Sequence, residues 1–179
     1  VQDCLVEWQE SLDVRVGALE GYAIAPVTEI GPSAREWASS PRLALRATVP
    51  APSCEISVAG REPDIRATVV SAVSLGEDRA AARGFITYEV RFAPANTFRF
   101  ILPKGTGGAV RFDEGGIRER TMRETGQGDE WTVVSQDAIL GAFTLNIDWI
   151  MPFKPGGAPV RAPEIRIPGA SSQRGFVLL

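Results

Sequence analysis

The chain has 179 residues, of which 44% are hydrophobic and 23% charged, a composition typical of a globular protein. Histidine is absent, which excludes a Ser-His-Asp triad, a Cys-His pair and a histidine-ligated zinc site. The net charge of −3 argues against a dedicated nucleic-acid binder. We therefore expect no catalytic centre built on histidine, no cofactor and no nucleic-acid partner.

Alternating apolar residues dominate the chain, which is the pattern of β-strands. Residues 64–75 and 82–92 flank the turn sequence 76–79, which predicts a hairpin. The one helix signal lies at 32–39, so we expect less than about a tenth of the chain in helix. In chain order the expected strands are 4–9, 12–18, 22–27, 42–48, 54–59, 64–75, 82–92, 97–102, 109–113, 117–123, 131–135, 142–150 and 174–179.

The cleanest alternation falls in residues 82–92, 97–102 and 142–150. A shift of one residue in these strands would expose every aromatic side chain, so the facing is strongly specified. The predicted core is Ile86, Tyr88, Val90, Phe92, Phe98, Phe100, Phe143, Leu145, Ile147 and Trp149. The intervening residues are expected to face solvent or a partner.

Many short strands with Gly and Pro turns predict an all-β fold. We expect an antiparallel β-sandwich, Ig-like or jelly-roll-like, with a β-barrel as the alternative. The sandwich is expected to span residues 1–151. Residues 152–179 are then a Pro/Gly-rich connection and a C-terminal strand, or the cut start of a further unit. No apolar run is long enough to predict a transmembrane segment.

Cys4 and Cys54 are the two cysteines of the chain. They predict either a disulfide bond or two buried thiols, and the sequence leaves both open. Neither is expected to be catalytic, because Asp3 and Glu55 lie beside them and oppose formation of a thiolate.

Three residues are candidates for contact with a ligand or partner. Trp37 lies in a long connection, where an aromatic side chain is available to a partner. Arg118 and Arg120 share one face of an expected strand and suit an anionic ligand or an acidic glycan, although the pattern favours a solvated face with cross-strand ion pairs. The acidic pair Asp113 and Glu114 lacks the spacing of a calcium loop, so we expect no metal site.

The order of elements carries a family resemblance. Residues 64–102 form a long strand, a hairpin and an aromatic strand that ends in Leu102-Pro103, and residues 117–150 follow as a meander with a closing strand. Over residues 43–151 this resembles β-sandwich segments of large bacterial envelope or secreted proteins. The resemblance implies a periplasmic, cell-surface or extracellular setting and no catalytic residues.

Together these features favour a non-catalytic β-sandwich module of a larger exported bacterial protein. Its expected function is protein–protein interaction, spacing or assembly. The expected partner is another protein or further domains of the same polypeptide. The alternative is a sandwich or barrel that binds a glycan or a lipid. A third hypothesis, a carboxylate-dependent hydrolase, requires two acids in one cleft.

Overall fold

The computed structural model of the chain describes residues 3–31, 36, 38–77, 79–106, 110–113, 115–152 and 163–178. This part is all-β, as predicted, and its sheets are open rather than closed into a barrel. The one helical element within it is the 3-10 turn η1 (Val27–Glu29). The helix signal at 32–39 lies largely outside the described residues.

The chain divides into two compact units, unit 1 (Val1–Glu62) and unit 2 (Pro63–Leu179). The sequence placed a boundary after residue 151 instead. The observed boundary differs because the C-terminal strand pairs with the first strand of unit 2 and belongs to that unit.

Unit 1 contains two small antiparallel sheets. The first has three strands in the order β1 (Asp3–Val6), β4 (Leu43–Ala47) and β3 (Tyr22–Ala25). The second is a two-stranded ribbon of β2 (Leu12–Glu20) and β5 (Ser53–Gly60). These strands form where the sequence alternates, as predicted.

Few side chains of unit 1 are buried. In the described part of this unit the buried hydrophobic residues are Ile30, Ala44 and Leu45. Arg46 ties the sheet to η1, because its guanidinium lies 3.4 Å from the Asp3 carboxylate and donates to the Glu29 carbonyl at 2.8 Å. Unit 1 is therefore held by strand pairing and polar contacts around a very small core.

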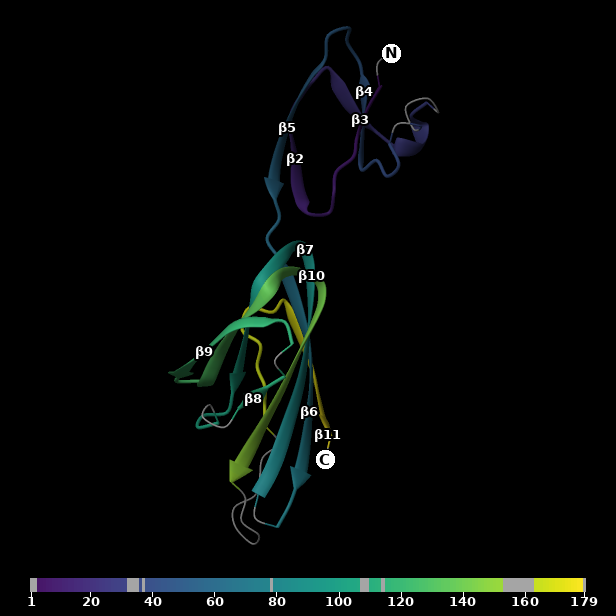
Figure 1. Cartoon of the computed structure of the whole chain (residues 1–179). Helices are drawn as coiled ribbons and strands as arrows, with labels where there is room; N and C mark the ends of the chain where they lie inside the picture. The colour runs from purple at the N-terminus through teal and green to yellow at the C-terminus, as the bar shows by residue number, and fades with distance from the viewer. Residues whose placement is uncertain are drawn as a thin grey trace. The chain divides into compact units, whose positions relative to one another are not determined.

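Unit 2 contains one large sheet in the order β11-β6-β7-β10-β8, with β9 pairing a different stretch of β10 (Figure 1). All of its pairings are antiparallel except β11 with β6, which is parallel. The predicted hairpin joins β6 to β7, and the amide of Gly76 donates to the carbonyl of Arg79 at 2.8 Å. The strands are β6 (Asp64–Leu75), β7 (Arg79–Leu102), β8 (Arg111–Phe112), β9 (Ile117–Thr125), β10 (Gly128–Pro152) and β11 (Ser172–Leu178).

Strands β7 and β10 form one long ribbon that bends in the middle. The register shifts between Val134 and Gly141 on β10, and Gly141 has a φ of 101°. On β7 the bend falls at Phe92, whose φ of 70° is rare for a residue with a side chain. The sequence predicts two separate strands, 82–92 and 97–102. In the structure they are the two halves of β7, one on each side of the bend.

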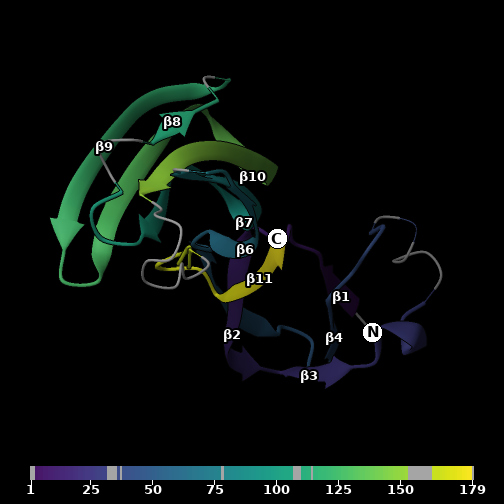
Figure 2. The ribbon, with the colours of Figure 1, turned by 90° about the horizontal axis from the view of Figure 1, so that it is seen from below.

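The bend brings the two halves of the ribbon face to face as a β-sandwich. The ring centroids of Tyr88 and Phe98, one from each half of β7, lie 4.9 Å apart. The Tyr88 hydroxyl donates to the Arg99 carbonyl at 3.1 Å. Figure 2 shows β8 and β9 toward one side of unit 2 and β6 and β11 toward the other. The choice between an Ig-like and a jelly-roll-like sandwich stays a prediction.

The core prediction is confirmed for eight of the ten residues, which are buried. Phe143 is half-buried and stacks on Phe98 with centroids 4.6 Å apart. Phe92 was wrongly predicted in the core, because its positive φ takes its side chain out of the strand alternation. Buried residues that the prediction missed include Phe112, Trp131, Val133, Ile165 and Ile167.

The cysteine prediction is wrong in both of its forms. Cys4 and Cys54 are free, and each is half-buried rather than buried. Cys4 on β1 pairs with Leu45, whereas Cys54 on β5 pairs with Leu19 in the other sheet of unit 1. The two thiols therefore belong to separate sheets.

Candidate functional site

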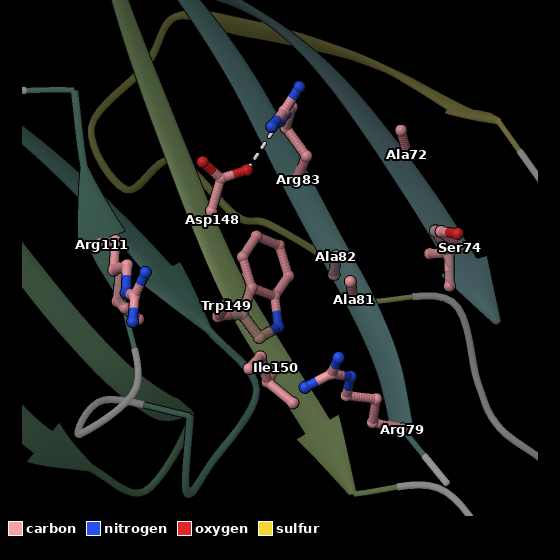
Figure 3. Close-up of a pocket in the computed structure, with 12 residues that line it drawn as sticks. Ala72, Ser74, Arg79, Ala81, Ala82, Arg83, Arg111, Asp148, Trp149 and Ile150 are labelled. Carbon is pink, nitrogen blue, oxygen red and sulfur yellow. Dashed lines mark hydrogen bonds and ion pairs between the residues drawn. The ribbon is translucent and has the colours of Figure 1, made fainter. Parts of the chain in front are cut away.

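A concavity of about 930 Å³ lies where β6, β7, β10 and β8 run side by side in unit 2 (Figure 3). It occupies the end of the sheet at the β6–β7 hairpin, away from the bend. Its described lining is Ala72, Val73, Ser74, Arg79, Ala81, Ala82, Arg83, Val110, Arg111, Asp148, Trp149 and Ile150.

Strand alternation decides which of these side chains face outward. Ala82 and Trp149 are each 2% exposed and belong to the core. Their neighbours Arg83 and Asp148 therefore project from the opposite face of the sheet, away from the core. We call that face the outer face. The charged side chains of the concavity lie on it, and the Trp149 indole does not.

The strand register aligns the outer-face residues across the sheet. Ala72 on β6 is opposite Arg83 on β7, Arg83 is opposite Asp148 on β10, and Asp148 is opposite Arg111 on β8. One step closer to the hairpin, small residues follow at Ser74 and Ala81. Small side chains between long ones leave the surface hollowed at this point.

The concavity carries an excess of positive charge. Its described lining has three arginines and one aspartate. Arg83 Nε donates to Asp148 Oδ1 at 2.6 Å (Figure 3), and this hydrogen bond, together with the aspartate charge, raises the pKa of the guanidinium above its ordinary value. Arg79 and Arg111 have no ion pair within the described part of the chain. No described carboxylate is therefore paired with either of these two guanidinium groups.

Apolar side chains continue the outer face toward β11. Phe176 on β11 is opposite Val70 on β6, which is opposite Phe85 on β7, and Leu178 is opposite Ala72. Phe176 and Leu178 are each 57% exposed, and Phe85 is 36% exposed. We call these five residues the apolar strip. Arg83 links the strip to the concavity, because its Cζ lies 6.0 Å from the centroid of the Phe85 ring.

Of the three residues proposed from the sequence, Arg118 and Arg120 do not line this concavity. Trp37 lies outside the described residues. Arg118 and Arg120 are exposed on β9, and the guanidinium of Arg120 lies 5.1 Å from the centroid of the Phe112 ring. Their role as contact residues stays a prediction.

Part of the lining of the concavity could be predicted from the sequence. Arg79 and Arg83 are four residues apart on β7, so alternation places them on the same face. The sequence predicts Arg79 in the turn 76–79 instead, with the strand beginning at residue 82. The position of Arg111 depends on the pairing of β8 with β10, which joins residues far apart in the chain. No local sequence pattern predicts the pairing of β8 with β10.

The described residues contain no group of three or more Cys, Asp and Glu side chains that could hold a metal ion. No helix in the described part of the chain is long and apolar enough to cross a membrane. No protein-family model matches the chain, and a search of curated proteins finds no match either. The three arginines of the concavity and the exposed residues of the apolar strip suit the outer face to anionic and apolar groups.

Proposed function

We propose that the chain is a non-catalytic β-sandwich module of a larger exported bacterial protein, and that its outer face docks an acidic, partly apolar segment of a partner protein. The observation that carries the proposal is the pairing of the apolar strip with the arginine-lined concavity on one face of unit 2. The exported setting rests on the resemblance to envelope and secreted proteins.

The apolar strip supports docking because exposed apolar side chains that adjoin on a sheet are typical of interaction surfaces. Residues such as Phe85 and Phe176 supply the large, stiff contact area that dominates binding energy in protein interfaces. A partner that covered them would remove apolar area from water.

The arginines specify the charge of the partner. With Asp148 held by Arg83, the remaining Arg79 and Arg111 favour a segment that carries carboxylates. The described lining contains one carboxylate, whereas hydrolysis of a glycosidic bond typically requires two. These features support binding rather than hydrolysis.

The test is a selection of binders from a random-peptide display library against the whole chain. We expect the enriched peptides to combine acidic and apolar residues, and Phe176→Asp to weaken their binding by about tenfold or more. The matched control is Leu140→Asp, since Leu140 is 63% exposed and lies outside the strip. Enriched peptides that bind the Phe176→Asp variant as tightly as the unchanged chain would contradict the proposal.

A further inference from the structure

The concavity has the chemistry of a defined subsite within the outer face. We propose that it is a carboxylate-binding site in which Arg79 and Arg111 hold the anionic group of the ligand over Ala81 and Ile150, which lie opposite each other on β7 and β10 between the two arginines. The inference deepens the proposed function, on which it rests for the identity of the ligand as an acidic side chain of a partner segment.

The arrangement of the four charged groups supports the site. Arg83 is already engaged, because its Nε lies 2.6 Å from Asp148 Oδ1. Asp148 also lies opposite Arg111 in the register, yet the two side chains form no ion pair. Among the described residues, no carboxylate is paired with Arg111 or with Arg79 at the other end of the concavity (Figure 3). A guanidinium group offers paired N–H donors that match the two oxygens of a carboxylate.

The floor and one wall of the concavity suit the aliphatic part of an acidic side chain. Ala81 is too small to fill the space between Arg79 and Arg111, and Ile150, which lies opposite it, adds an apolar surface that is 51% exposed. An acidic side chain can place its methylene groups on this surface while its carboxylate reaches the arginines. Inorganic phosphate has no such aliphatic part, so we expect it to bind more weakly than a carboxylate.

Asp148 gives the site a distinctive prediction. Its negative charge opposes an incoming carboxylate and also occupies Arg83. Asp148→Asn removes the charge and releases Arg83, so this variant should bind carboxylates more tightly than the unchanged chain. A merely structural role for Asp148 would not produce tighter binding.

The experiment titrates the whole chain with glutarate, a dicarboxylate with an aliphatic body, and follows the arginine Nε–Hε signals by NMR. Because the arginines are exposed, we expect weak binding that falls about two- to fivefold in Arg79→Gln and in Arg111→Gln. Arg118→Gln is the matched control, since Arg118 is an exposed arginine on β9 outside the concavity. Asp148→Asn should raise the affinity by about two- to fivefold.

Each outcome decides the inference. Binding that is absent, or equal in all three arginine variants, overturns it, and so does weaker binding by Asp148→Asn. Phosphate that binds more tightly than glutarate overturns the carboxylate assignment. Peptides that depend on Phe176 but are insensitive to Arg79→Gln and Arg111→Gln leave the proposed function standing without this subsite. If glutarate binding responds to the variants as expected but no peptide binds, the carboxylate site stands and the proposed docking of a partner segment fails.

Discussion

Units 1 and 2 are both built from alternating strands, yet they differ sharply in what those strands bury. The described part of unit 1 has three buried hydrophobic residues. In unit 2 the buried cluster includes six aromatic rings, from Tyr88 on β7 to Trp149 on β10. Alternation therefore predicts a strand but does not guarantee a second layer to cover it.

The β2–β5 and β7–β10 ribbons show why some alternating strands lack a second layer. The β2–β5 ribbon pairs Val14 with Val58 and Val16 with Ile56, but Val16, Ile56 and Val58 are exposed. The β7–β10 ribbon bends at Phe92 and Gly141 and covers its own apolar face. An isolated two-stranded ribbon is marginally stable in water, whereas a ribbon that folds back on itself supplies both layers of a core.

The largest expected effect is in the core of unit 2. Phe98→Ala removes a ring that packs on Tyr88 and Phe143, and we expect a loss of about 3–5 kcal/mol in the free energy of unfolding of unit 2. Urea unfolding followed by the amide signals of unit 2 measures this loss. A midpoint that does not move would contradict the sandwich packing.

The second-largest expected effect is a loss of stability in the core of unit 1. Leu45 is 1% exposed and is one of the few buried side chains there, so Leu45→Ala should cost about 2–5 kcal/mol. Because the core of unit 1 is so small, we expect this change to unfold unit 1 while the amide signals of unit 2 persist. Simultaneous loss of both sets of signals would show that the units unfold as one.

A third prediction uses pH. Burial raises the pKa of Tyr88 above its ordinary value of 10.0, so the folded state keeps a proton that the unfolded state loses. The stability of unit 2 should be unaffected by this group below about pH 10 and should then fall by about 1.4 kcal/mol for each further pH unit. The measurement is urea unfolding between about pH 9 and 11 in the unchanged chain and in Tyr88→Phe. Equal slopes in the two proteins would exclude Tyr88 as the cause.

The smallest expected effect lies on the outer face. Thr144 is exposed beside the half-buried Phe143, so Thr144→Ala should change the free energy of unfolding by no more than about 0.5 kcal/mol. Phe143→Ala, its matched comparison, should lower the urea midpoint clearly because Phe143 stacks on Phe98. The opposite ranking would mean that the facing of β10 is inverted.

The sequence predicts strand positions well and their assembly poorly, for physical reasons. Residues 64–75 and 142–150 alternate cleanly, and alternation is a local property that survives in the fold. The bend at Phe92 could not be predicted, because a positive φ at phenylalanine is imposed by the tertiary structure. The site follows the same division. Arg79 and Arg83 are close in the sequence, although the predicted turn includes Arg79, whereas Arg111 joins them through a long-range pairing.

The parallel pairing of β11 with β6 has a mechanical consequence. Tension applied to the start of β6 at Asp64 and to the end of β11 at Leu178 pulls two parallel strands in opposite directions along their length. The load then falls on the whole ladder of seven paired residues at once, in shear, rather than on one hydrogen bond after another, as when a hairpin is unzipped. Resistance to such a pull is governed by the rate of unfolding. The parallel pairing therefore opposes extension of unit 2 between these two ends by shear.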